Sequence, residues 1–264
     1  MVERLLGYIG YPFIQFYETI EKFGQFILFQ TQLFKLYPLA FKRYKIVLTQ
    51  IEVIGLGCMG VVTLTGLFTG MVEAIQLYGG FHQFGIENFI GYTIFLSITK
   101  ELGPVFASLM LISRSISAMA AELGTMRVSE QIDAIDILGV NSKEYLITPR
   151  IIATVISLPL LVIWFDFVAI GSAYIISTSV LGINPIAYQE TLMRLGEFSD
   201  IMTGVIKAAV FGFIVSSIGS YIGYHTSGGA RGVGQSTIYA VVYSAVAIFI
   251  TNYFLSSLFL YLDW

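Results

Sequence analysis

Three ionisable side chains interrupt long apolar runs and are the residues of this chain best placed to do chemistry. Lys100 and Glu101 are neighbours inside an apolar run at residues 89–119. Asp166 lies near the middle of a later run. A charge in the middle of a membrane helix costs about 2.5 to 3.5 kcal/mol, so such residues normally face a partner or a water-filled cavity. Lys100 and Asp166 fall at similar depth, and we expect them to pair or to share a polar cavity. The alternative is that Lys100 is satisfied by Glu101 or by backbone carbonyls.

Pro104 follows the charged pair within the same run. Proline removes a backbone donor and disfavours helical geometry at the residue before it, here Gly103. The run is also longer than the roughly 20 residues that cross a bilayer core. We therefore expect a helix kink at residues 102–104, in a helix that is tilted or broken. Arg114 lies about two turns from the end of the run, where its side chain either snorkels to the interface or has a function.

A second group of charged residues follows this run in a pattern typical of a short amphipathic helix. Three apolar and three acidic residues occupy two helical faces: Val128, Ile132 and Ile135, and Glu130, Asp133 and Asp136. Gly139 is a natural helix stop. The pattern predicts a helix of about three turns, too short and too charged to cross a membrane, between two spans. Such a helix is either an interfacial connector or a docking element for another protein.

The composition is that of a membrane protein. Of 264 residues, 56% are hydrophobic and only 12% are charged, and the mean hydropathy is +0.80. These values do not fit a soluble globular domain. Long apolar runs predict five transmembrane helices, at about residues 47–72, 89–119, 151–181, 201–224 and 237–262. The predicted fold class is therefore an all-α integral membrane protein.

Residues 1–45 mix basic side chains with many aromatic rings, a combination typical of the lipid headgroup region. Charged residues such as Glu18 and Lys22 interrupt the segment, which argues against a transmembrane span. We expect an interfacial amphipathic helix in residues 1–45, followed by a five-span domain at residues 46–264.

Basic residues assign the two sides of the membrane. Outside the predicted spans, Lys and Arg are concentrated in residues 1–45 and in the segments after the second and fourth spans, whereas the opposite side holds only Arg194. The positive-inside rule then places the N-terminus and the acidic helix in the cytoplasm, and the C-terminus outside. The outside segments are too short for a folded domain, so any domain on that side must belong to another polypeptide.

Small residues recur every four positions in two of the predicted spans. Gly66 and Gly70 form a GxxxG pair in the first span. A longer series runs along the fourth span: Gly204, Ala208, Gly212, Ser216 and Ser220. Such stripes let a second helix approach closely. That helix belongs either to the same subunit or to another copy of the chain, and both alternatives remain open.

Several common site types are not expected. His82 and His225 are the only histidines and fall on opposite sides, and Cys58 is the single cysteine, so we expect no metal site, disulfide or catalytic triad. The segment SGGARGVGQS has Gln235 where a phosphate-binding loop needs lysine, and we expect a flexible turn there. With a net charge of -3 and no basic stripe, nucleic-acid binding is not expected.

The polar motifs around the second span resemble a known family signature. ELGP at residues 101–104 and AAELGTMRVSEQIDAI at residues 120–135 are similar to the signature of the MlaE permease family, the membrane subunits of bacterial lipid-transporting ABC systems associated with MCE-domain proteins. The resemblance extends over about residues 50–262, and it combines rare intramembrane charges with a long polar motif. It implies a permease subunit in the bacterial inner membrane that moves phospholipid to or from a periplasmic MCE-domain protein, for outer-membrane lipid homeostasis.

The resemblance also implies partners and roles for particular residues. Two copies would form the membrane core, each contacting a cytoplasmic ATPase that uses ATP, while this chain itself binds no cofactor and catalyses no reaction. A small cytoplasmic accessory protein is a further expected partner. The segment at about residues 126–139 would be a coupling helix seated in the ATPase, through Arg127, Val128, Glu130, Gln131, Ile132, Asp133, Ile135 and Asp136. Lys100, Glu101 and Asp166 would line the substrate cavity or its gate.

Two other classes of function are compatible with the residues. An ion- or proton-coupled secondary transporter would use Lys100, Glu101 and Asp166 as a relay and would act without an ATPase. No internal repeat is evident, which weakens this interpretation because many such folds show paired halves. A non-transporting membrane anchor is the third class, and for that role the buried charges would have no purpose.

Overall fold

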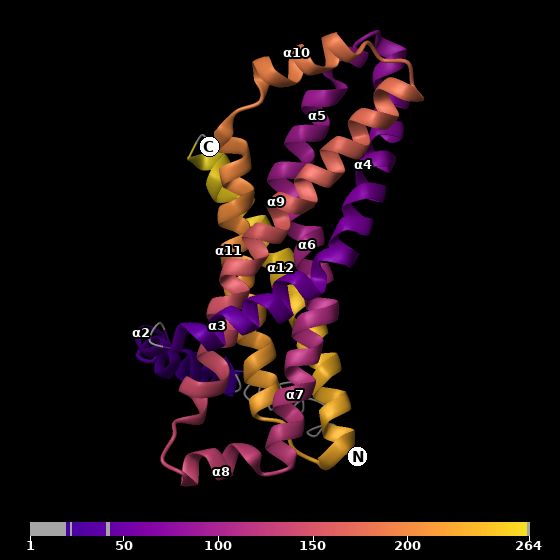
Figure 1. Cartoon of the computed structure of the whole chain (residues 1–264). Helices are drawn as coiled ribbons and strands as arrows, with labels where there is room; N and C mark the ends of the chain where they lie inside the picture. Colours follow the sequence, from indigo (N-terminus) through magenta and orange to yellow (C-terminus); the bar gives the residue numbers. More distant parts are fainter. Residues whose placement is uncertain (1–19, 22, 41–42, 263–264) are drawn as a thin grey trace, which may run out of the picture.

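The computed structural model describes residues 20–21, 23–40 and 43–262, and all regular secondary structure in these residues is helical (Figure 1). Five continuous helical segments are long and apolar enough to cross a membrane: Tyr44–Phe84, Glu87–Val128, Lys143–Ser179, Phe198–Tyr224 and Gly229–Tyr261. The predicted class and the five predicted spans are confirmed. Most segments are longer than predicted, because a helix keeps its backbone hydrogen bonds beyond the apolar residues that sequence analysis counts.

The first two spans consist of α-helical pieces joined by π-helical turns, whereas the fourth and fifth are single α-helices. Their bounds, with those of the connecting helices, are α2 (Tyr37–Ala40), α3 (Tyr44–Ile51), α4 (Gly57–Phe84), α5 (Ile90–Ser97), α6 (Gly103–Leu111), α7 (Ser117–Val128), α8 (Gln131–Ile137), α9 (Thr148–Ser179), α10 (Pro185–Leu195), α11 (Phe198–Tyr224) and α12 (Gly229–Tyr261). Residues 23–34 are also helical. π-Helical turns occupy Glu52–Leu56, Ile98–Leu102, Ile112–Ile116 and Lys143–Ile147. A short 3-10 turn at Glu87–Phe89 precedes α5.

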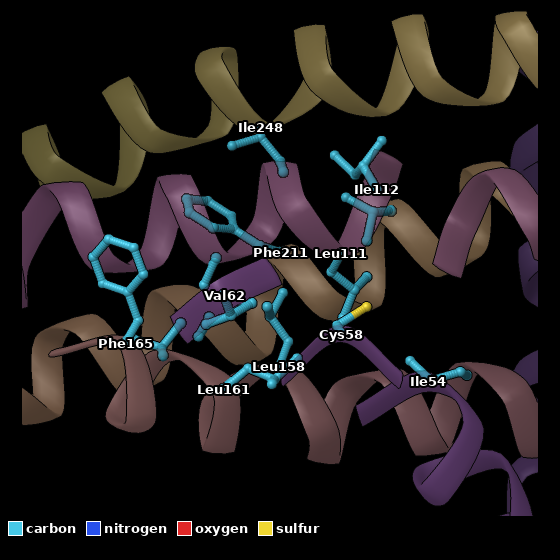
Figure 2. Packing of buried hydrophobic residues seen from close by; sticks show 14 of the residues in the cluster. Ile54, Cys58, Val62, Leu111, Ile112, Leu158, Leu161, Phe165, Phe211 and Ile248 are labelled. Carbon is cyan, nitrogen blue, oxygen red and sulfur yellow. The ribbon is translucent and has the colours of Figure 1, made fainter. Parts of the chain in front are cut away.

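The core lies where α9 packs between α4 and α11, with the second span and α12 against α11. Figure 2 shows side chains from these helices meeting there, among them Leu111, Phe165 and Phe211, all fully buried. In Figure 1, α8 and α10 lie at opposite ends of the long spans, and α3 lies across them nearer to α8. The two ends of the molecule therefore carry different short helices.

The small-residue stripes are used for packing within this chain. A side chain at Gly70 would overlap the carbonyl group of Ala169 in α9, and one at Gly204 would overlap the carbonyl group of Thr99 in the second span. Close approach of the helices thus requires glycine at both positions. Of the two alternatives left open by the sequence, packing inside one subunit accounts for these contacts.

The predicted single acidic helix of three turns is wrong. α7 continues unbroken from the second span to Val128, and the chain then turns at Glu130, which has a left-handed φ of 60°. α8 has only 7 residues. Val128 and Glu130 therefore do not share the helix of Ile132, because the backbone hydrogen bonds of the span persist longer than its apolar pattern. Gly139 has a φ of 77°, which confirms the predicted stop.

The predicted flexible turn at residues 227–236 is much shorter than expected. α12 begins at Gly229, so Arg231 and Gln235 lie in its first turns. Gly228 and Gly229 have φ values of 87° and 66°, and they reverse the chain within a few residues. The preceding element is α11, a helix rather than the strand that a phosphate-binding loop requires.

The predicted interfacial segment 1–45 lies partly outside the described residues. In its described part, Phe29 is buried within residues 23–34 and packs edge-on against Tyr221, near the end of α11. Leu33, one turn later, is fully buried. This helical segment is thus anchored to the same end of the bundle as α8.

Candidate functional site

The second span is interrupted where the sequence predicts a kink. The turn at Ile98–Leu102 is π-helical. The next helix, α6, begins at Gly103, and Pro104 is its second residue. Because proline has no N–H group, the carbonyl of Lys100 loses the donor that an α-helix would supply. Lys207 of α11 replaces it, donating from Nζ to this carbonyl oxygen at 2.8 Å. The helix break thereby creates a binding position for a cation from another span.

The carboxylate of Glu101 is the centre of a polar network that joins three spans. Lys207 Nζ lies 2.8 Å from Glu101 Oε1, to which Ser256 also donates at 2.8 Å. Asn252 donates to Glu101 Oε2 at 2.8 Å. The side chain of Lys207 is 1% exposed and that of Glu101 is 42% exposed. The ammonium is thus enclosed, while one side of the carboxylate faces out from the chain.

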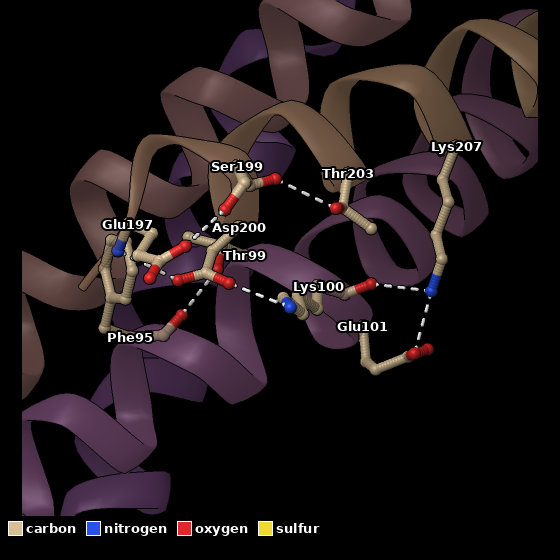
Figure 3. A network of polar contacts seen from close by, with 9 residues as sticks. All are labelled: Phe95, Thr99, Lys100, Glu101, Glu197, Ser199, Asp200, Thr203 and Lys207. Atoms are coloured by element: carbon tan, nitrogen blue, oxygen red, sulfur yellow. Dashed lines mark hydrogen bonds and ion pairs between the residues drawn. The ribbon is translucent and has the colours of Figure 1, made fainter. Parts of the chain in front are cut away.

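Lys100 forms a separate ion pair with the beginning of α11 (Figure 3). Its Nζ lies 2.8 Å from Asp200 Oδ1. Asp200 Oδ2 accepts a hydrogen bond of 3.0 Å from the backbone N–H of Glu197, as part of a capping box that starts the helix. Lys100 and Glu101 therefore contact two positions seven residues apart on one face of α11. We call the set Lys100, Glu101, Asp200, Lys207, Asn252 and Ser256 the central seam.

The predicted pairing of Lys100 with Asp166 is wrong. Asp166 is 6% exposed and packs against Gly103, and its Oδ1 has no hydrogen-bond partner among the described residues. Sequence counting placed the two residues at similar depth, but it is Gly103, not Lys100, that faces α9. Lys100 instead turns toward Asp200. The three residues proposed for a relay do not form one hydrogen-bonded chain.

Several members of the central seam were missed by sequence reasoning. Lys207 was visible as a lone charge in the fourth apolar run, opposite in sign to Glu101, and this was the signal that could have found it. Asp200 was assigned to a loop because it precedes the apolar residues of that run. Asn252 and Ser256, one turn apart in the last run, are uncharged and gave no such signal. The seam holds two cations and two carboxylates, so its charges balance.

The predicted docking residues lie at the α8 end, but their acidic groups are held within the chain. Arg127 pairs with Asp133 at 2.6 Å. Asp136 accepts hydrogen bonds of 2.9 and 3.0 Å from the backbone and the hydroxyl of Ser142. Ile132 is fully buried. These contacts fix the position of α8 relative to α7 and to the turn that follows α8.

Two large apolar side chains are exposed at the α8 end. Ile137 is 85% exposed and Leu138 is 80% exposed. Sequence reasoning missed both, because it looked for docking residues on the apolar face of Val128, Ile132 and Ile135 and on the acidic face. His225 lies nearby, and its burial lowers its pKa, an effect that the neighbouring charges of Lys143 and Arg127 reinforce. Acidic side chains of the same segment, Asp133 and Asp136, are also exposed beside the two apolar ones. α8 itself is short and firmly placed.

No catalytic or metal-binding arrangement is present in the described part of the chain. No group of three or more His, Cys, Asp or Glu side chains lies together there. Some serines of the second span donate to backbone carbonyls, as Ser113 does to Met110 and Ser117 to Ser113. Another, Ser97, donates to the carboxylate of Glu73 in the first span, at 3.2 Å. These contacts hold the spans together.

Comparisons with known proteins identify relatives along most of the chain. Residues 47–258 match the family model described as Permease MlaE. A probable ABC transporter permease protein of Rickettsia bellii is 39% identical over 98% of this chain and 99% of its own length. The intermembrane phospholipid transport system permease protein MlaE of Haemophilus influenzae is 29% identical over 98% of both chains. The chloroplastic protein TRIGALACTOSYLDIACYLGLYCEROL 1 of Arabidopsis thaliana is 42% identical over 80% of this chain and 61% of its own length.

Proposed function

The chain belongs to the MlaE permease family, and from this premise we propose that it is the membrane subunit of an ABC transporter that moves phospholipid between the inner membrane and a periplasmic MCE-domain partner. Such transport would serve outer-membrane lipid homeostasis. The chain is a multi-pass membrane protein whose own residues bind and position rather than catalyse. ATP is bound and hydrolysed by a separate cytoplasmic ATPase, with which a small accessory protein associates.

The observation that carries the proposal is the uncovered apolar tip of α8. Ile137 and Leu138 are almost fully exposed at an end of the molecule where the neighbouring side chains are charged. Exposed apolar groups rimmed by polar residues are typical of protein–protein contacts. The ATPase would cover this tip together with the segment 126–139. Because α8 is tied to α7 through Arg127 and Asp133, movement of the ATPase would reach the second span directly.

The distribution of basic residues supports the orientation of the chain. Lys and Arg outside the spans gather at the end that carries α8, which supports an orientation with this end and the N-terminus in the cytoplasm. α10, at the opposite end, and the C-terminus then face the periplasm. An MCE-domain partner would meet the chain on that side.

The central seam is our candidate for the gate of the lipid path. Glu101 is the member that is partly open to the outside of the chain. Two of its hydrogen bonds come from α12, from Asn252 and Ser256. In the most apolar stretch of α12, only 17% of the residues are buried within one chain. A second copy of the chain on this side would enclose a cavity that Glu101 faces and that Lys100 borders. Asp166 would help to fix the position of the second span beside the gate, through its contact with Gly103.

Affinity purification from the native membrane tests the proposal. We expect a tagged wild-type chain in mild detergent to retain an ATPase and an MCE-domain protein, identified by mass spectrometry, together with phospholipid. A variant with Ile137→Ser and Leu138→Ser should lose the ATPase and keep the MCE-domain protein. Ile186→Ser, at a residue of α10 that is 74% exposed, is the matched control and should keep the ATPase. Recovery of the chain without any ATPase, in several detergents, would contradict the proposal.

A further inference from the structure

A cavity of about 320 Å³ opens between α3, the second span and the beginning of α9, away from the central seam. Three charged side chains line it: Arg114 and Glu122 from the second span, and Arg150 from α9. The transport proposal uses none of these residues. An occupant of the cavity would lie beside two arginine side chains, Arg114 and Arg150.

The charges in the cavity do not balance. Arg150 is 5% exposed and is fully engaged, with Nη2 at 3.0 Å from Glu122 Oε1 and Nη1 donating to the carbonyl of Leu146 at 3.0 Å. The guanidinium of Arg114 makes no hydrogen bond or ion pair with any residue that the structure describes. One positive charge is therefore left over. An unpaired guanidinium at a membrane boundary favours an anionic ligand, because desolvating it without a partner is costly.

The backbone around Arg114 is shaped to leave this side chain available. Both Arg114 and Val53 belong to π-helical turns, at Ile112–Ile116 and Glu52–Leu56, on the two sides of the cavity. Such turns are rare and occur frequently at functional sites. Gly57, at the start of α4, lies beside the Nε atom of Arg114, so the guanidinium packs against this helix.

The orientation of α3, the first part of the segment Tyr44–Phe84, favours a position of the cavity near the lipid headgroups. α3 lies across the long spans on the α8 side of the bundle (Figure 1), as an interfacial helix does. At the rim of the cavity, Val53 is 62% exposed and Ala118 is also exposed, so the opening is apolar and faces outward. An occupant with an anionic head and apolar chains would match both parts of this lining.

We propose that this cavity binds the phosphate group of a phospholipid from the leaflet on the α8 side, at a site separate from the transport path. The single negative charge of a phosphodiester offsets the excess charge of Arg114. A guanidinium also presents two parallel N–H donors to two phosphate oxygens. Arg150 forms the inner wall of the cavity, and the acyl chains extend out of the opening beside Val53 and Ala118. Bound lipid would tie α3 to the second span.

Thermal unfolding of the delipidated, detergent-solubilised complex with defined probes tests this site. We expect dioleoylphosphatidylglycerol to raise the unfolding temperature of the wild type at lower concentrations than dioleoylglycerol, which lacks phosphate. Arg114→Gln should shift the half-saturating phosphatidylglycerol concentration upward about tenfold, the loss expected for charge-assisted hydrogen bonds. Arg231→Gln, at an exposed arginine in the first turn of α12, should leave it unchanged.

Two further arms distinguish the possible results. Ala118→Phe fills the cavity without changing its charge and should weaken the response to phosphatidylglycerol as well, which keeps the test valid if Arg114→Gln folds poorly. Saturation by inorganic phosphate alone, lost in Arg114→Gln, would identify the same anion site with free phosphate as its ligand. An equal response to dioleoylglycerol, or an unchanged response in both cavity variants, would overturn the proposal. None of these outcomes depends on transport or on the ATPase.

Discussion

The central seam and the α8 end both carry charged side chains, but they use them in different ways. In the seam, each ion pair joins two spans: Lys207 reaches Glu101, and Lys100 reaches Asp200. At the α8 end, Arg127 pairs with Asp133, six residues away, and Ile137 and its neighbour stay uncovered. The seam thus holds this chain together, whereas we propose that another protein completes the α8 end. Substitutions in the two regions should therefore separate stability from partner binding.

The largest effect on stability is expected for Lys207→Met. It leaves the carboxylate of Glu101 without its cation and the carbonyl of Lys100 without its donor, while Lys207 itself is 1% exposed. We expect the free energy of unfolding to fall by about 3 kcal/mol, the low end for breaking a buried pair, because Glu101 is partly exposed. Denaturant unfolding in detergent micelles measures it. The exchange of Glu101→Lys with Lys207→Glu should recover part of the loss, and full stability in Lys207→Met would show that the pair is dispensable.

A smaller loss is expected for Lys100→Met. The side chain of Lys100 is 27% exposed, and Asp200 retains its hydrogen bond from the backbone of Glu197 when the ammonium is removed. The loss should be about 1 kcal/mol, as for other partly exposed ion pairs. The same unfolding measurement compares it with Lys207→Met. If Lys100→Met were the more damaging of the two, the seam would be centred on Asp200 and not on Glu101.

Asp166→Asn should have almost no effect on stability. No cation among the described residues pairs with this carboxyl group, and asparagine has the same shape, so the contact with Gly103 is kept. We expect a change within about 0.5 kcal/mol. Asp166→Leu, which adds bulk against Gly103, is the contrasting variant and should be more harmful. A loss in Asp166→Asn comparable with that in Lys207→Met would mean that a charged partner reaches Asp166.

The smallest effect on stability is expected at the α8 tip. Ile137→Ser with Leu138→Ser removes two side chains that contact little of the chain, so the unfolding transition should move by less than about 0.5 kcal/mol. Ile132→Ser in the same helix is the matched control, because Ile132 is fully buried and its loss should destabilise. If the tip variant unfolds as readily as Ile132→Ser, the tip belongs to the core and not to a docking surface.

Much of the fold could be predicted from the sequence because the bilayer imposes simple rules. The five spans, the break beside Pro104 and the stop at Gly139 follow from apolar length, a missing backbone donor and a residue free to take a positive φ. The turn at Glu130 could not be predicted in this way. The backbone hydrogen bonds of α7 continue beyond its last apolar membrane residues. In addition, Glu130 adopts a left-handed conformation that is uncommon for residues other than glycine.

The candidate site was predicted less completely than the fold. Lys100 and Glu101 stood out because charges are costly in an apolar run, yet their partners depend on the rotation of α11 and α12, which the sequence does not specify. Lys207 was visible but could not be assigned to Glu101 without knowing which faces meet. Asp166 was paired wrongly because depth in the membrane says nothing about direction around a helix axis.

Lipid transfer by reconstituted complexes tests the central claim, that this chain is an ATP-driven lipid permease, most directly. The chain is placed in proteoliposomes with the proposed ATPase and MCE-domain partners, and the movement of a fluorescent phospholipid to or from the MCE-domain protein is followed with and without ATP. We predict transfer that requires ATP and that is lost in the variant with Ile137→Ser and Leu138→Ser, although this variant remains folded. Equal transport by the chain alone, driven by an ion gradient and insensitive to ATP, would contradict the claim and favour a secondary transporter.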